Sequence, residues 1–304
     1  MGLKNFGIIF YLIFFGGAIG VLGKFALVSF RPETLIFLRL LITVTIFTLI
    51  LWQKKKLGYA LYMLKKHLLD FFILALSGIG GGMILGFFGL SITTAVNYDL
   101  LFNMSSIFMA VLAIFLLKEK LTLKNLALLI LAFFGSVLII SKGNLQTFDL
   151  KASLGDLLVM LGALGWALYS IYGSYLSKNT SIDSLTLVYN TFVVSLILLG
   201  PYLIYKSNLT VAPVTASALI ATMLLGIFST ALLFYLWFEI INLGGGILGG
   251  FITLGENIGG VVFPILLLGE RPTWPVWLGG AIILGAMLIY EHKKARNDKS
   301  FLAS

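Results

Sequence analysis

The sequence contains no cysteine and only two histidines, His67 and His292. Without cysteine the chain can form no disulfide bond, no thiol nucleophile and no thiolate metal site. Both histidines stand at the ends of apolar runs, so neither a zinc cluster nor a Ser-His pair inside such a run is expected. The sequence also has no Gly-x-x-x-x-Gly-Lys-Ser/Thr loop, which argues against ATP as an energy source. We therefore predict a protein that is not an enzyme, with no catalytic residue, metal or cofactor.

The sequence also has few charged residues. Only 11% of the 304 residues are charged, whereas 60% are hydrophobic. A soluble domain carries about 25% charged residues, and no soluble core could enclose this much apolar surface. The net charge of +9 comes from basic residues that cluster at the ends of apolar runs. This distribution favours contact with a membrane surface over binding to nucleic acid.

Ten apolar runs are long enough to cross a bilayer, which takes about 20 residues per helix. They are Gly7–Ala26, Glu33–Gln53, Leu68–Leu90, Ala95–Leu117, Leu121–Ile140, Leu154–Leu176, Ser184–Tyr205, Ala216–Ile240, Gly246–Leu268 and Trp274–Tyr290. The runs are too continuously apolar for the strands of a membrane barrel. The segments between them are short, and the longest predicted linker is Lys54–His67. The predicted fold is all-α and integral to the membrane, with ten transmembrane helices in a lipid bilayer.

The distribution of basic residues predicts the orientation. With both termini on one side, that side collects fourteen of the 21 lysines and arginines and the other side six, which leaves Arg39 inside a run. An excess of Lys and Arg marks the cytoplasmic side, so both termini are predicted to be cytoplasmic and the protein to lie in the plasma membrane. The first run has no small-residue cleavage site followed by a soluble domain, so it is expected to be a retained helix.

A heptad appears twice in the sequence. Leu-Leu-Lys-Glu-Lys-Leu-Thr at Leu116–Thr122 returns as Leu-Leu-Gly-Glu-Arg-Pro-Thr at Leu267–Thr273, 151 residues later. Each copy lies between two long apolar runs, the first between the fourth and fifth runs and the second between the ninth and tenth. Because five runs per copy is an odd number, the second copy must enter the membrane from the opposite side. We predict two inverted five-helix repeats, residues 1–146 and 147–304, whose two packings of similar energy permit alternating access.

The doubled heptad, the chain length and the two five-helix halves resemble the drug/metabolite transporter superfamily, and within it the EamA family. The resemblance covers nearly the whole chain. It implies a secondary transporter, often an exporter, of amino acids or other small metabolites. It also implies a central cavity formed mainly by the first, third, fourth, sixth, eighth and ninth helices. A small-molecule substrate is therefore the expected partner, and a homodimer is an open alternative to a monomer.

Ionisable residues inside the runs cost about 2.5–3.5 kcal/mol each on insertion scales, which makes them candidates for function. Glu256 is the strongest, because it lies near the middle of the ninth run. Thr253, Asn257 and Gly260 share one helical face with it. Glu256 is expected to bind a coupling proton or a substrate amine. The alternative is a protonated structural carboxyl group bonded to a neighbouring helix.

The fourth run has a matching polar stripe. Asp99, Asn103 and Ser106 lie on one helical face, and Ser106 corresponds to Asn257 at the offset of 151. The two stripes predict a shared site on the pseudo-two-fold axis. Arg39 either pairs with Asp99, binds an anion or reaches toward the headgroups.

Trp166 and Tyr169 in the sixth run are candidates to clamp a substrate, with ordinary packing between helices as the alternative.

The leading hypothesis is a secondary transporter, coupled to protons or to exchange. The alternatives are a membrane-embedded enzyme that uses Asp99 and Glu256, and a passive channel or lipid-handling scaffold.

Overall fold

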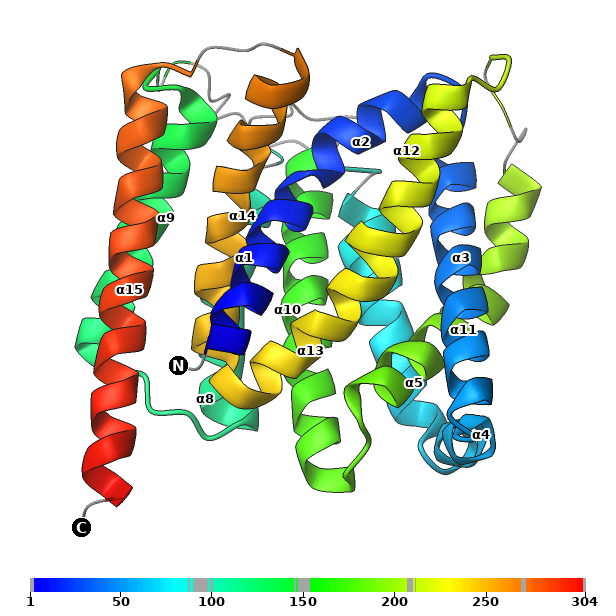
Figure 1. Cartoon of the computed structure of the whole chain (residues 1–304), viewed down its shortest axis with the longest axis horizontal. Helices are drawn as coiled ribbons and strands as arrows, with labels where there is room; N and C mark the ends of the chain where they lie inside the picture. The colour runs from blue at the N-terminus through cyan, green and yellow to red at the C-terminus, as the bar shows by residue number, and fades with distance from the viewer. Residues whose placement is uncertain are drawn as a thin grey trace.

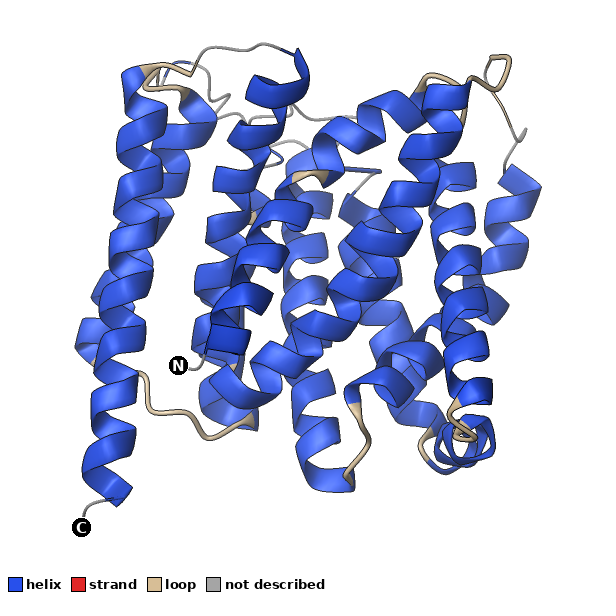
Figure 2. Cartoon of the chain, viewed as in Figure 1, coloured by secondary structure: helices blue, strands red, loops and turns tan. Residues whose placement is uncertain are grey.

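A computed structural model describes residues 3–86, 88–89, 98, 101–144, 146, 154–206, 210, 212–268 and 272–302. Within these residues every regular element is a helix, as Figure 2 shows, and the one strand-like pairing is a bridge between Phe30 and Thr210. The predicted all-α class is therefore confirmed.

The helices run mostly side by side, and α1 begins and α15 ends on the lower side of the bundle in Figure 1. The first half contains α1 (Leu3–Gly17), α2 (Ile19–Leu27), α3 (Pro32–Gln53), α4 (Leu57–Lys66), α5 (Leu68–Leu74), the π-helix η1 (Ala75–Leu85), α8 (Ser105–Leu116) and α9 (Leu123–Ser141). The second half contains α10 (Leu154–Thr180), α11 (Ser184–Lys206), α12 (Ala216–Gly226), the π-helix η3 (Ile227–Leu232), α13 (Leu233–Gly244), α14 (Gly246–Leu268) and α15 (Trp274–Leu302).

Six helical stretches in the described part of the chain are long and apolar enough to cross a membrane. They are Pro32–Gln53, Leu68–Leu85, Leu123–Ser141, Leu154–Thr180, Ala216–Gly244 and Gly246–Phe263. The bent pair α1 and α2, whose axes differ by 41°, would be a seventh, and three shorter apolar helices accompany them. Each of the ten predicted runs thus contains a described helix, although the fourth is described as a continuous helix only from Ser105 onward.

The predicted linker Lys54–His67 contains a short helix that the sequence did not predict. Residues Leu57–Lys66 form the helix α4, which Figure 1 shows nearly end-on at the base of α3. A ten-residue segment with two lysines falls below the length and apolarity of a spanning helix, so a search for spans overlooks it. Its turns are stabilised by packing, because Ala60 is fully buried against the bundle.

Helices from the two halves pack against each other throughout the bundle. α3 packs on α11, α8 on α14, and α9 on α15, while α1 lies against α14 and η1 against α10. Where α9 meets α15, a Cβ atom added to Gly279 would lie 2.4 Å from the carbonyl oxygen of Gly135. Small residues permit this close approach of two backbones, which is a principal source of helix association in membranes.

The two π-helical segments occupy related places in the two halves. Residues 76–81 of η1 correspond to residues 227–232 of η3 at the same offset of 151 as the heptads. A π-helical turn leaves carbonyl groups without their usual partners. In the second half Thr230 Oγ1 donates to Leu225 O at 2.7 Å, and Tyr11 Oη in α1 donates to Phe228 O at 2.9 Å. These bonds stabilise η3 within the bundle.

Glu119, the acidic residue of the first heptad, caps a helix of the other half. Its carboxylate accepts hydrogen bonds from the backbone N–H groups of Gly246, at 2.7 Å, and Ile247, at 3.3 Å. Gly245, which precedes them, has φ +85°, a conformation that favours glycine. The heptad therefore holds the α8–α9 connection at the positive end of the α14 dipole.

We expect Glu119→Ala to lower the free energy of unfolding by about 1 kcal/mol, the usual effect of removing a helix cap. Glu119→Gln should lose less, because its amide oxygen still accepts one of the two bonds while the charge is gone. Unfolding in mixed micelles measures both variants. Equal stability of Glu119→Ala and the native protein would contradict the role of this cap.

Candidate functional site

The polar side chains of the fourth and ninth predicted runs meet where α8 packs on α14. Asn103, just before α8, and Asn257 in α14 exchange amide hydrogen bonds, each Nδ2 donating to the other Oδ1 at 3.3 Å. Both Nδ2 atoms also donate to Ser136 Oγ in α9, at 2.8 Å from Asn103 and 3.3 Å from Asn257. Ser106 is fully buried and donates to the Asn103 carbonyl oxygen at 2.7 Å. Three helices are thus joined by one polar cluster.

The polar stripes of the sequence predict a common site for Asn103 and Asn257, and the structure brings these two residues into contact. Ser136 was not predicted, because its only signal in the sequence is its place beside Gly135 on a face of small residues. Amide pairs of this kind fix the relative position of helices because an unpaired amide between helices is costly. The cluster therefore holds α8, α9 and α14 in fixed positions relative to one another.

A double-mutant cycle should detect the amide pair. We expect Asn103→Ala and Asn257→Ala to be non-additive, with a coupling free energy of about 0.6 kcal/mol and an upper bound of about 1.7 kcal/mol. Unfolding of the single and double variants in bicelles gives this number, and Ser136→Ala serves as the matched control for the third partner. Additivity within about 0.3 kcal/mol would show that the two amides do not interact.

Glu256 precedes Asn257 and turns toward α1. A Cβ atom added to Gly16 would lie 2.6 Å from Glu256 Cδ, so the absence of a side chain at Gly16 leaves the space that the carboxyl group occupies. The carboxyl group is partly buried, and in the described part of the chain it has no hydrogen bond or ion pair. The alternative of a structural carboxyl group bonded to a neighbouring helix therefore has no partner among these residues.

One hydroxyl group on α14 and one on α8 also lack partners in the described part of the chain. Thr253 Oγ1 lies one turn before Glu256 in α14, and Ser105 Oγ corresponds to Glu256 in the first half. Both are buried, and neither has a hydrogen bond in the described part of the chain. Buried polar atoms in proteins are nearly always hydrogen-bonded, so these two hydroxyl groups are exceptions within the described part of the chain.

Arg39 lies about two turns from the start of α3 and is almost fully buried. Its Nε donates to Thr230 Oγ1 in η3 at 2.9 Å. The predicted partner Asp99 lies outside the described residues. The neighbouring Ser229 Oγ donates to Phe15 O at 3.1 Å, and Phe15 directly precedes the Gly16 that contacts Glu256. Arg39 and Glu256 are therefore linked through α1 and η3 over a few residues.

Trp166 and Tyr169 of α10 belong to a packed aromatic cluster with α13. The Trp166 ring lies 5.4 Å from Phe234 and 5.3 Å from Trp237 between centroids, and Tyr169 lies 5.1 Å from Phe238. Tyr169 is fully buried, and its hydroxyl group has no hydrogen-bond partner in the described part of the chain. The packing alternative thus accounts for the rings, whereas it leaves the Tyr169 hydroxyl group without a hydrogen bond in the described part of the chain.

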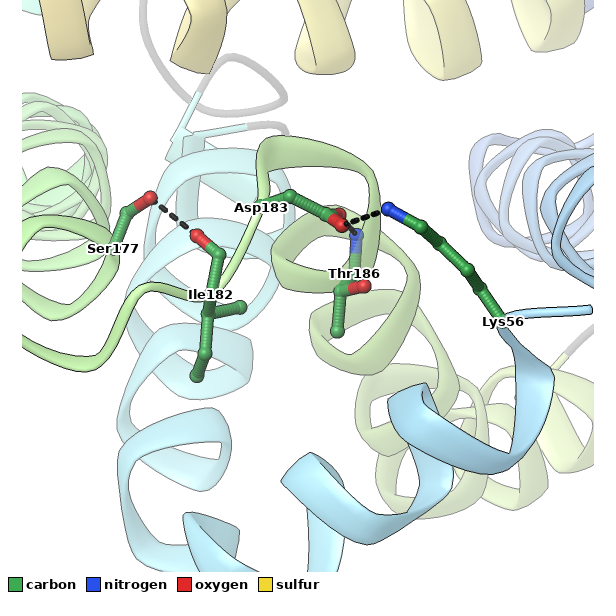
Figure 3. Close-up of polar contacts among 5 residues, drawn as sticks. All are labelled: Lys56, Ser177, Ile182, Asp183 and Thr186. Carbon is green, nitrogen blue, oxygen red and sulfur yellow. Dashed lines mark hydrogen bonds and ion pairs between the residues drawn. The ribbon is translucent and has the colours of Figure 1, made fainter. Parts of the chain in front are cut away.

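The lower end of the bundle holds a second group of polar contacts, drawn in Figure 3. Lys56 Nζ lies 3.1 Å from Asp183 Oδ2, and the Thr186 N–H donates to Asp183 Oδ1 at 2.8 Å. Partial burial alone would raise the pKa of Asp183, but these hydrogen bonds and the Lys56 charge lower it below its ordinary value. The ionised Asp183 therefore joins the start of α11 to the turn between α3 and α4.

Apolar spanning helices, paired helices from two halves and buried polar groups between them define a multi-pass membrane transport protein. The sequence model of the EamA-like transporter family matches this chain twice, over residues 5–141 and 153–290. The chain therefore belongs to the EamA-like transporter family, as its resemblance had indicated. A small-molecule substrate and a lipid environment follow from this membership.

Individual relatives agree with this assignment. The chain is 30% identical over 227 residues to the uncharacterized transporter YyaM of Bacillus subtilis (strain 168), an alignment that covers 74% of this chain and 73% of that protein. It is 29% identical to an uncharacterized transporter of Archaeoglobus fulgidus, with 73% and 75% covered. A crystal structure with 16% sequence identity shares the fold, with a TM-score of 0.75 over 93% of this chain and 95% of that one.

Proposed function

We propose that the protein is a secondary active transporter that exports amino acids or related small polar metabolites, driven by proton coupling or by exchange. The observation that carries the proposal is the Glu256 carboxyl group, which has no partner in the described part of the chain and lies at the contact of α1 with α14. An ionisable group inside a spanning helix is costly, and such groups in membrane proteins mark substrate or proton pathways. Glu256 would bind the coupling proton or the amine of the substrate.

The remaining site residues take complementary roles in this proposal. Arg39 offers a cation to an acidic group of the substrate, since only the neutral Thr230 hydroxyl group bonds its Nε. The hydroxyl groups of Thr253 and Tyr169, which have no partner in the described part of the chain, would form hydrogen bonds with a polar solute. The pair Asn103 and Asn257 holds α8 and α14 together behind Glu256, with Ser106 supporting the Asn103 backbone. Asp99 is proposed as a further acidic group of the site, and Trp166 as an aromatic wall.

Alternating access is supported by the internal repeat. The family matches each half separately, related helices pack in pairs across the bundle, and both π-helical segments fall at related positions. We therefore propose ten transmembrane helices in two inverted repeats, divided near residue 146, with both termini in the cytoplasm and the bundle in the plasma membrane.

Labelling of single cysteines tests this orientation, because the native chain has no cysteine. Lys120→Cys and Thr273→Cys place thiols at exposed positions in the two heptads. We expect an impermeant maleimide added outside cells to label Thr273→Cys only. Labelling of both variants from one side would contradict the inverted repeat.

Transport itself is tested in proteoliposomes with a panel of radiolabelled amino acids, nucleosides, sugar phosphates and organic cations. A carrier that works by alternating access shows counterflow, in which unlabelled solute inside drives transient uptake of labelled solute from outside. We expect counterflow with amino acids or related polar solutes. Fluxes without counterflow would indicate a passive channel and would contradict the proposal.

A further inference from the structure

The short helix α4 is held firmly against the lower end of the bundle. In Figure 1 its axis points toward the viewer, whereas α3 runs along the page. Ala60 is fully buried, and Asn190 Nδ2 in α11 donates to the Ala60 carbonyl oxygen at 2.9 Å. Lys56, at the start of α4, pairs with Asp183 at 3.1 Å. α4 is therefore an ordered platform that lies across the ends of spanning helices.

The outward side of α4 combines aromatic, aliphatic and basic side chains. Tyr59, Leu61 and Tyr62 are exposed, and so are Lys65 and Lys66 in the last turn. A helix that exposes tyrosine and leucine beside lysine is typical of the boundary between acyl chains and headgroups. In that layer the apolar parts of these side chains leave water while the ammonium groups stay in it.

The helices on both sides of α4 locate this boundary. Trp52, in the last turn of α3, is 68% exposed, and Leu69, in the first turn of α5, is 70% exposed. Tryptophan at the end of a spanning helix marks the headgroup level, and an exposed leucine beside it faces acyl chains. Because α4 connects these two helix ends, its exposed side continues the lipid-facing surface of the bundle.

Basic residues on this surface lack acidic partners within the protein. Lys54, Lys55, Lys65 and Lys66 are exposed, and none forms an ion pair in the described part of the chain. The nearby carboxylates are already engaged, because Asp183 binds Lys56 and Asp70 binds His67 and the Tyr172 hydroxyl group. We call Lys54, Lys55, Lys65 and Lys66 the α4 lysines.

We propose that α4 and the α4 lysines form a binding surface for the headgroups of anionic phospholipids in the leaflet on this side of the bundle. The surface presents four ammonium groups at the depth where lipid phosphates lie, and tyrosines that anchor the helix there. An anionic phospholipid supplies a negative charge for the lysines and acyl chains for the exposed apolar side chains, whereas a soluble acidic protein supplies only the charge. Because Lys56 and Asn190 join α4 to α11, lipid binding also steadies the contact between the two halves.

The test uses the full chain in proteoliposomes that contain spin-labelled phosphatidylglycerol or phosphatidylcholine. The motionally restricted fraction of each lipid gives their relative affinities for the protein. Each lysine near an anionic surface contributes roughly a fivefold preference. We therefore expect the native protein to prefer phosphatidylglycerol by at least about tenfold at low salt. Substitution of the four α4 lysines by glutamine should reduce this preference to about twofold or less.

The matched control removes the same charge from exposed lysines elsewhere. Lys118, Lys120, Lys124 and Lys178 are also exposed on this side, and their substitution by glutamine should leave most of the preference intact. An equal loss in both quadruple variants would overturn the proposal, because the effect would then come from net charge alone. If the α4 variant does not fold, salt titration of the native protein decides, and a preference unaffected by 1 M salt, where the screening length is about 3 Å, would overturn it.

A second measurement locates α4 in the membrane. Gly58 is exposed, and a Cβ atom added there meets nothing within 4 Å, so Gly58→Cys accepts a fluorophore in this cysteine-free chain. We expect a nitroxide on the lipid headgroup to quench this fluorophore more strongly than a nitroxide deep in the acyl chain or one in water. Strongest quenching from water would place α4 outside the headgroup layer and contradict the proposal. Neither measurement involves transport, so its failure leaves the transport proposal untouched.

Discussion

Replacement of Glu256 by glutamine is expected to remove the effect of a pH gradient on transport while leaving the protein folded in the membrane. Glutamine has nearly the same volume but cannot exchange a proton, and Gly16 leaves the same space for it. Coupling between two binding events is worth about 1–3 kcal/mol, or about 5–150-fold in affinity. We therefore expect a pH gradient that multiplies solute accumulation in the native protein to have no effect in Glu256→Gln, whereas counterflow continues.

The measurement is uptake of labelled solute into proteoliposomes with and without an imposed pH gradient. Glu239→Gln is the matched control, since Glu239 is a partly buried carboxyl group in α13, outside the contact of α1 with α14. The control variant should keep the pH response. Uptake by Glu256→Gln that remains normal and pH-sensitive would exclude Glu256 as the proton site. Loss of counterflow with retained folding would instead assign Glu256 to substrate binding.

Among the described glycines, Gly17 is expected to give the largest effect when it is replaced by alanine. A Cβ atom at Gly17 would lie 2.2 Å from Gly260 N, 2.3 Å from Gly259 C and 2.5 Å from Glu256 O. These are backbone atoms of α14, so no side chain can rotate away and the helices themselves must separate. Overpacking of this kind costs about 1–3 kcal/mol. It also displaces Glu256 from α1, so we expect loss of both thermal stability and transport.

Gly7→Ala provides the control within the same helix. A Cβ atom at Gly7 meets nothing within 4 Å, so the added methyl group should be neutral or slightly stabilising, as alanine is in helices. Thermal unfolding in detergent and counterflow in proteoliposomes measure both variants. Equal melting temperatures for Gly17→Ala and Gly7→Ala would show that α1 and α14 can separate without cost.

The sequence predicted those features of the fold that depend on hydropathy alone. Apolar length and continuity indicated spanning helices, and each of the ten predicted runs contains a helix. Helical spacing placed Asn103 and Asn257 on polar faces, and the structure joins them directly. These inferences succeeded because lipid imposes one strong rule on the chain, namely that backbone polar groups must be satisfied within each segment.

Features that depend on contacts between distant segments could not be predicted in the same way. Ser136 looks like one more small residue, and only the packing of α9 makes it a partner of both amides. The amphipathic α4 is stabilised by Asn190 from the other half, which no local pattern reveals. Trp166 and Tyr169 were candidates to clamp a substrate, yet their neighbours on α13 determine that the rings are packed together.

Glu119 forms contacts between distant parts of the chain that the repeated heptad does not indicate. The heptad reads as a local sequence repeat, but its carboxylate binds amide groups 127 and 128 residues further along the chain. If the two halves were produced as separate polypeptides, the N–H groups of Gly246 and Ile247 at the start of α14 would lack their carboxylate partner until the two polypeptides associated. Each half therefore stabilises the other through this contact, and we expect the whole chain to unfold in a single transition.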